Sequence, residues 1–182
     1  QPQVVPAHQT FYQKLRRQGV QVNFLGYDLL CISLPQYFVA EAAVGFTHWL
    51  VVVSDSDGAI CISASVANEL SEWLETNSQS KPQFKVNWFQ LGAEISNSGS
   101  SRNLSTKAPG VLNQLEQRPS FLMVSMLEPR KAHAQVLDAF EHLWRAKIDC
   151  NLVIVGKQGW MVENLVERLR DHPEKGKRLL WL

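Results

Sequence analysis

The chain has 182 residues, of which 45% are hydrophobic and 19% are charged, and its formal net charge is +1. This composition is typical of one or two soluble globular units and excludes a chain that is disordered throughout. A near-neutral balance supplies no basic field for nucleic acid and no long cationic run for a membrane surface.

The cysteines and the two ends of the chain indicate the cellular compartment of the protein and the extent of the given chain. Cys31, Cys61 and Cys150 lie far apart in apolar segments, without the spacing of metal ligands or of a disulfide framework. We therefore expect reduced core thiols in a cytoplasmic protein. The N-terminus has no signal-peptide core, and no apolar run is long enough to span a bilayer. Because the chain begins without Met and ends on the apolar run RLLWL, we interpret it as a fragment of a longer protein.

The first half of the chain alternates between helical and strand patterns. The expected elements are a short helix over 9–18 ended by Gly19, a mostly buried strand over 20–30 that leads into a loop, a turn over 34–38, a helix over 40–53, a strand over 59–63, a helix over 65–76 and a strand over 84–91. Tyr27 and Asp28 follow the first strand. They either present polar groups to a cleft, or Asp28 caps the next turn.

The composition then changes over residues 94–110, which are rich in Ser, Asn and Gly. This pattern predicts a linker between two domains. The alternative is a long surface loop inside one domain, but a run of this length is uncommon in a compact unit.

The second half predicts a regular alternation of strands and helices. The expected elements are a strand over 120–125, a helix over 132–147, a strand over 150–156, a glycine turn over 156–160, a helix over 161–172 and the start of a strand over 178–182. Such βαβ units imply a parallel sheet that is covered on both faces. Ligands bind outside the carboxyl ends of the strands of such sheets.

Two adjacent cations, Arg130 and Lys131, lie at this edge, just before a predicted helix. A helix start favours anions, so a negative partner is expected. That partner is either Glu128, in an exposed ion pair, or a ligand phosphate held by the helix N–H groups and both side chains. Gly156 and Gly159 lie at the same edge, where they either bring backbone close to a sugar or nucleotide or form a left-handed turn.

Several common functional motifs are absent from the sequence. It contains no dinucleotide-binding glycine motif and no P-loop, and its histidines lack metal-binding spacing. It also lacks the nucleophile elbow of serine hydrolases. His133 follows Lys131 closely enough to share its ligand, but a histidine at such a position is more often a surface residue of the first helical turn.

The combination of segments, more than any one motif, resembles glycosyltransferase family 4 (group 1). Within this family it is most similar to the bacterial mannosyltransferase-like enzymes that build lipopolysaccharide O-antigen and other surface polysaccharides. The segments that carry the resemblance are GYDLL, LPQYF, DGAICISASVANELSEWL, FKVNWFQLGAEI, FLMVSMLEPRKAHAQVLDAFEHLW and NLVIVGKQGWMVENLVERL.

The resemblance implies an α/β fold of the GT-B type, with parts of two Rossmann-like domains that have parallel sheets and are truncated at the C-terminus. Residues 1–93 would be the later part of the acceptor-binding domain, 94–119 a linker, and 120–182 the beginning of the nucleotide-sugar-binding domain. The implied activity is retaining transfer of a hexose, with mannose as the first candidate, from a nucleotide sugar such as GDP-mannose to a saccharide or lipid-linked saccharide. No metal, cofactor or nucleic acid is implied, and peripheral membrane association of the full-length enzyme is compatible with the resemblance.

The resemblance also implies roles for individual residues. Arg130 and Lys131 would hold the donor diphosphate and act catalytically by stabilising charge on the leaving phosphate. Gly92, Gly156 and Gly159 would lie at the donor, and Tyr27 and Asp28 would lie on the acceptor side.

The sequence departs from the family pattern at three positions and at its end. Ser125 stands where relatives usually have Gly, and Ala132 stands where they have Gly or Asn. Tyr27 stands where many relatives have His. The chain stops before the paired glutamates of the family, so we expect it to be inactive by itself. A second hypothesis is a non-catalytic remnant that acts at most as a binding or interaction module. A third hypothesis is a phosphate-binding module unrelated to sugars.

Overall fold

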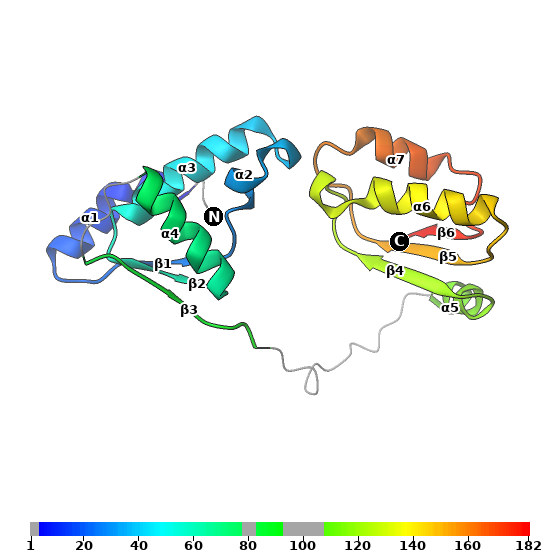
Figure 1. Ribbon diagram of the computed structural model, residues 1–182, viewed down its shortest axis with the longest axis horizontal. Coiled ribbons are helices and arrows are strands. Elements are labelled where there is room, and N and C mark those ends of the chain that lie inside the picture. Colours follow the sequence, from blue (N-terminus) through cyan, green and yellow to red (C-terminus); the bar gives the residue numbers. More distant parts are fainter. Residues whose placement is uncertain (1–3, 78–82, 93–107) are drawn as a thin grey trace. The chain divides into compact units, whose positions relative to one another are not determined.

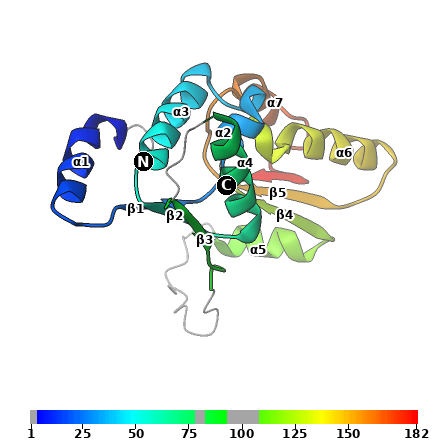
Figure 2. The same ribbon diagram turned by 60° about the vertical axis from the view of Figure 1, so that its left-hand side comes forward.

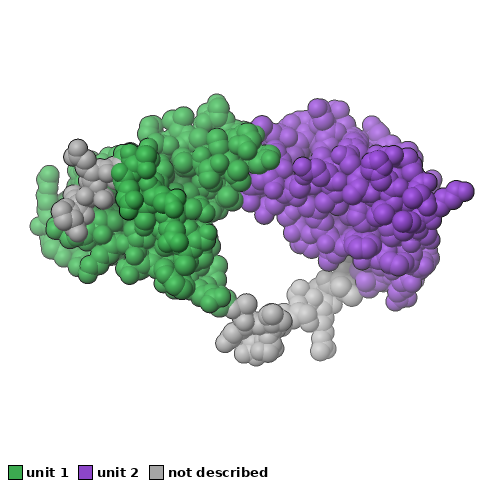
Figure 3. All heavy atoms as spheres, in the orientation of Figure 1, with its two compact units in different colours: residues 1–96 green, residues 97–182 purple. Residues whose placement is uncertain are grey.

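The computed structural model describes residues 4–77, 83–92 and 108–182. The chain forms two compact units, residues 1–96 and 97–182, which Figure 3 shows in different colours. The division lies inside the segment in which the composition changes, and the roles of the two units as acceptor and donor domains remain predictions.

The first unit contains a three-stranded parallel sheet in the order β1-β2-β3. Its helices α3 and α4 lie on one face of this sheet (Figure 1). The elements in chain order are η1 (Pro6–His8), α1 (Gln9–Arg17), β1 (Asn23–Gly26), α2 (Leu30–Ser33), η2 (Pro35–Tyr37), α3 (Ala40–Ser54), β2 (Gly58–Cys61), α4 (Ala64–Asn77) and β3 (Lys85–Trp88).

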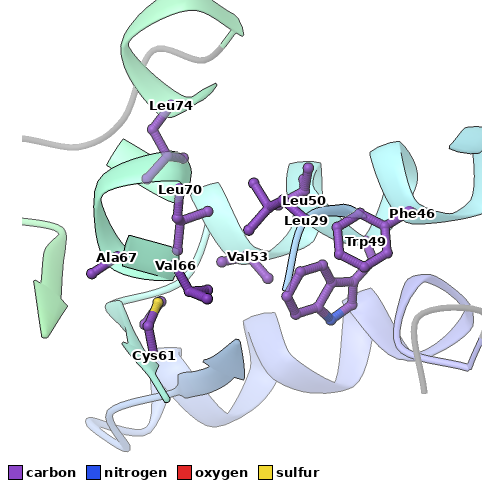
Figure 4. Close-up of a cluster of buried hydrophobic side chains, with 11 residues drawn as sticks. Leu29, Phe46, Trp49, Leu50, Val53, Cys61, Val66, Ala67, Leu70 and Leu74 are labelled. Atoms are coloured by element: carbon purple, nitrogen blue, oxygen red, sulfur yellow. The ribbon is translucent and has the colours of Figure 1, made fainter. Parts of the chain in front are cut away.

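The core of the first unit is formed where α3 and α4 meet the sheet (Figure 4). Leu50 and Val53 of α3 are fully buried, and Leu70 and Leu74 of α4 pack in the same cluster. Burial of each large apolar side chain contributes about 1.5–3 kcal/mol, so these two helices hold the unit together.

The carboxylate of Asp57 attaches α1 and the segment that follows it to the rest of the first unit. Arg16 Nε donates hydrogen bonds to both carboxylate oxygens of Asp57, each at 3.0 Å, and the backbone N–H of Val22 donates to the same carboxylate at 2.8 Å. Gly19, with φ +83°, ends the helical segment, as its position predicts.

The second unit has the same parallel arrangement, with the strand order β4-β5-β6. Helices α6 and α7 lie on one face of the sheet and α5 lies on the opposite side (Figures 1 and 2). The elements are α5 (Ala108–Glu116), β4 (Ser120–Val124), η3 (Pro129–Lys131), α6 (His133–Arg145), β5 (Asn151–Val155), α7 (Glu163–Arg170) and β6 (Leu179–Trp181).

Alternation along the strands positions the core of the second unit. Leu152 and Ile154 of β5 pack with Leu137 of α6 and Val166 of α7, and all four are buried. The two helices are thereby fixed with their first turns beyond the carboxyl ends of β4 and β5.

Helix α5 was not predicted. It lies in the expected linker 94–119, where a Pro and a Gly near its start are typical of a turn. Pro109 is the second residue of the helix, a place where no intrahelical N–H bond is lost, so a helix is compatible with it. The remaining linker residues up to 107 lie outside the described residues.

Two further predictions are corrected. The strand expected over 20–30 is limited to β1, because a short helix begins at Leu30. In the second sheet, Leu122 and Val124 are each 67% exposed, so the described residues cover its second face only in part. The α/β class and the parallel strand order agree with the sequence prediction.

Candidate functional site

A cavity of about 410 Å³ lies at the carboxyl edge of the second sheet. Its walls are the loops that follow β4 and β5 and the first turns of α6 and α7. The lining residues are Glu128, Pro129, Ala132, His133, Ala134, Gln135, Met161, Val162, Glu163, Asn164 and Leu165.

Both helices begin at this cavity without a side-chain cap. No side chain hydrogen-bonds the N-terminal N–H groups of α6 or of α7 from their N-cap residues, Ala132 and Val162. The first N–H groups of a helix have no intrahelical partner and carry the positive end of the helix dipole. The two helix N-termini therefore favour an anion in the cavity, although Glu128 and Glu163 place two carboxylates in its wall.

Backbone strain is concentrated at the same place. Three non-glycine residues of the described segments have a positive φ, and two of them line this cavity: Ala132 at 59° and Met161 at 54°. A left-handed conformation costs an L-residue about 1–2 kcal/mol. Strain of this kind is found at ligand sites, because the required geometry outweighs the local cost.

The basic pair lies on the turn η3 between two lining residues. Arg130 and Lys131 are not themselves among the lining residues of the described cavity. Arg130 Nε lies 2.9 Å from Glu128 Oε2, close enough for an ion pair but not aligned as a hydrogen bond. Glu128 is only 5% exposed, so the exposed ion pair expected from the sequence is in fact largely buried.

His133, the first residue of α6, is 1% exposed, which shows that the surface alternative is wrong. Its Nε2 lies 3.3 Å from Ser125 Oγ, whereas its buried Nδ1 has no hydrogen-bond partner among the described residues. Burial, followed by the charge of Lys131, lowers the pKa of His133. The imidazole is therefore neutral near pH 7.

Gly156 and Gly159 bring the two loops of the cavity wall together. A Cβ added at Gly156 would lie 1.9 Å from the carbonyl oxygen of Ser125, and one at Gly159 would lie 2.5 Å from that of Leu127. Neither glycine has a positive φ, so the left-handed-turn alternative is wrong. The close approach that they permit is to the protein backbone, and a direct contact with a donor stays a prediction.

Hydrogen bonds confirm that the two loops are joined. Leu127 N donates to Lys157 O at 2.9 Å, and Gly159 N donates to Leu127 O at 2.9 Å. The ladder between β4 and β5 is thus continued beyond the strands, up to the start of the turn that carries Arg130.

The first unit also has a cavity at the carboxyl edge of its sheet. It measures about 520 Å³ and is lined by Val5, Phe24, Leu25, Tyr27, Asp28, Cys31, Phe46 and Trp49. Asp28 Oδ1 also accepts a hydrogen bond from Leu30 N at 3.2 Å, so Asp28 both caps the next turn and faces the cavity. Gly92 follows β3 with open space around it, and its relation to a donor stays a prediction.

A larger cavity in the second unit, of about 560 Å³, lies at the opposite ends of α6 and α7. Its charged side chains pair with one another: Arg168 with Glu141, and Arg178 with Glu174, both at 2.7 Å. The first pair joins α7 to α6, and the second lies within the segment before β6. We therefore interpret this cavity as structural.

Sequence reasoning located the turn of Arg130 but missed its surroundings. The burial of Glu128, the pairing of Ser125 with His133 and the contribution of α7 all depend on contacts between distant segments. In the described part of the chain, no helix has both the length and the apolar character needed to cross a membrane.

Comparisons with known proteins show a family match in the second unit. Residues 105–177 match the family described as glycosyl transferases group 1. Three Escherichia coli proteins, each named serotype-specific mannosyltransferase WbdA, are 40% identical to the chain over 177, 177 and 172 residues. These alignments cover 95%, 95% and 92% of the chain but only 22%, 21% and 21% of the relatives, so the chain spans about a fifth of their length.

No solved structure matches the chain. The family match covers the strands, helices and loops that build the cavity at the carboxyl edge of the second sheet, and the identity to the WbdA proteins extends over both units. The second unit is therefore similar in sequence to the group 1 glycosyltransferases.

Proposed function

We propose that this chain is part of a glycosyltransferase that transfers mannose from a nucleotide-sugar donor to a saccharide acceptor in surface polysaccharide synthesis, with a retaining mechanism. The observation that carries the proposal is the 40% identity over 95% of the chain to serotype-specific mannosyltransferases. The group 1 match over residues 105–177 supports the assignment of the second unit to the donor.

The donor diphosphate would lie at the mouth of the cavity formed by α6 and α7. Two uncapped helix N-termini and the adjacent cations Arg130 and Lys131 supply the positive potential that a diphosphate needs. Each charge-assisted hydrogen bond to it would contribute about 1.5–3 kcal/mol.

The same groups would also accelerate the transfer. Cleavage of the bond between sugar and diphosphate increases the negative charge on the leaving phosphate. Fixed cations and helix N–H groups then bind the transition state more tightly than the ground state, which raises the rate as well as the affinity. We propose Arg130 and Lys131 as the catalytic residues in this sense.

The acceptor would lie on the first unit. Its cavity combines the aromatic rings of Phe24, Phe46 and Trp49 with the polar groups of Tyr27 and Asp28, a combination suited to the apolar faces and hydroxyl groups of a sugar. Gly156 and Gly159 would support the donor site by joining the loops that carry it, and Gly92 would lie near the donor in the assembled enzyme.

Calorimetric titration of GDP-mannose into the chain tests the proposal, with UDP-glucose for comparison. The key variant is Arg130→Ala, Lys131→Ala. The matched control is Arg170→Ala, Lys177→Ala, which removes the same charge from exposed positions at the other end of the unit. We expect binding that is lost in the first variant and kept in the control. Equal binding by the wild type and the Arg130 and Lys131 variant would overturn the proposal.

A further inference from the structure

The carboxylate of Glu128 is buried in the wall of the proposed anion site. The residue is 5% exposed, and its Oε2 accepts no hydrogen bond from the described residues. A buried carboxylate is costly unless a positive charge compensates it. Arg130 forms an ion pair with it, with Nε at 2.9 Å from Oε2.

The pair constrains Arg130 at one edge of its guanidinium group. The Nε atom is itself buried, whereas the side chain as a whole is 26% exposed, so its exposed part lies elsewhere. The Nε edge of Arg130 is therefore held in place, and the rest of its side chain is partly exposed on a turn next to the first turn of α6. A long side chain that is already ordered loses less entropy when it binds a ligand.

A carboxylate at this place would otherwise be unfavourable. Glu128 lines a cavity that we assign to an anion, and its charge alone would repel a diphosphate. Removal of Glu128 therefore has opposite effects on affinity under two hypotheses. If the carboxylate only adds negative charge, its removal strengthens anion binding, whereas if it positions Arg130, its removal weakens binding.

We propose that Glu128 is a positioning residue that holds Arg130 in the geometry that binds the donor diphosphate. This inference rests on the proposed function, because it requires Arg130 to contact the donor. It assigns to Glu128 a role that acts through Arg130 and not by contact with the substrate.

The test is a double-mutant cycle on the full chain, with GDP-mannose as the probe and calorimetry as the readout. The variants are Glu128→Gln, Arg130→Ala and the combination of both. We expect Glu128→Gln to weaken binding by about tenfold, which is the size of one charge-assisted hydrogen bond. We also expect it to cause no further loss of binding once Arg130 is removed. Glu128→Asp, which keeps the charge but shortens the side chain, should weaken binding as well.

Urea unfolding of the same variants reports on the ion pair independently of any ligand. Arg130→Ala leaves a buried carboxylate without compensation, so its unfolding midpoint should fall, and the midpoint should recover in the double variant. This measurement separates loss of the fold from loss of the site.

The outcomes separate this inference from the proposed function. Loss of binding in Arg130→Ala together with unchanged or tighter binding in Glu128→Gln would overturn the positioning role and leave the donor site intact. Binding that is insensitive to Arg130→Ala would overturn the proposed donor contact, and the inference with it. A double variant that binds more weakly than Arg130→Ala alone would also contradict a role through Arg130.

Discussion

Replacement of Gly156 by Ala should disrupt the joint between the two loops of the donor-side cavity. The added Cβ would lie 1.9 Å from the carbonyl oxygen of Ser125, whereas Cβ atoms essentially never approach within 3.0 Å of such an atom. The loops must therefore separate by about 1 Å, because a backbone oxygen cannot rotate away as a side chain can.

The loss of stability can be estimated from the hydrogen bonds that join the two loops. Ser125 N donates to Val155 O at 3.1 Å and Leu127 N donates to Lys157 O at 2.9 Å. Loss of two such bonds costs about 1 kcal/mol each, and overpacking adds about 1–3 kcal/mol. We therefore expect Gly156→Ala to lower the free energy of unfolding by about 3–5 kcal/mol, a large fraction of a domain's typical stability of about 5–15 kcal/mol.

Urea unfolding followed by far-ultraviolet circular dichroism measures this effect. Gly110→Ala is the matched control, since Gly110 lies in α5 with open space around it, and Ala favours a helix there by about 1 kcal/mol. A Gly156→Ala protein as stable as the wild type would refute the reasoning, because the loops would then have room that the structure does not show.

Three further predictions concern the same unit. Ala132→Gly should raise the free energy of unfolding by about 1 kcal/mol, since it relieves the left-handed φ of 59°, and an unchanged urea midpoint would contradict this. The lowered pKa of His133 means that the unfolded state binds the proton more readily. Its contribution to stability is therefore complete above the ordinary His pKa of 6.5 and is lost as the pH falls from there through the folded pKa. The drop in unfolding midpoint between about pH 7.5 and pH 5.5 should be smaller in His133→Gln than in the wild type, and equal drops would show that His133 is not responsible. Leu137→Ala should cost about 2–5 kcal/mol because Leu137 is fully buried, whereas Leu122→Ala at a 67% exposed position should change the urea midpoint little, and equal losses would contradict the assigned core.

The strands and long helices could be predicted because their apolar residues recur with the period of the element. The run SFLMV became β4 and NLVIV became β5, and each is followed by a helix within the predicted range. Helix α5 could not be predicted in this way, because Pro109 and Gly110 are turn signals and its position depends on tertiary contacts. One such contact is the hydrogen bond that Asn151 Nδ2 donates to Gln114 O at 3.4 Å.

In the candidate site, too, the local features could be predicted from the sequence and the contacts between distant segments could not. The position of Arg130 at a helix start follows from the local pattern, and so does the expectation of a negative partner. Which partner is present does not follow from it, because the burial of Glu128 depends on how its loop packs. Likewise, Gly156 was expected to bring backbone close to a sugar or nucleotide, and the close approach to the backbone of Ser125 follows only from the register of the two loops.

The most direct test of the central claim is to map where a nucleotide sugar binds. Amide chemical shifts of a nitrogen-15-labelled chain, followed during titration with GDP-mannose, report on each backbone N–H group. If the cavity at the carboxyl edge of the second sheet is the donor site, the largest changes should occur at Ala134 and Gln135 of α6 and at Asn164 of α7, and they should vanish in Arg130→Ala, Lys131→Ala. Saturable changes confined to the opposite ends of these helices, or no change in a folded protein, would contradict the account.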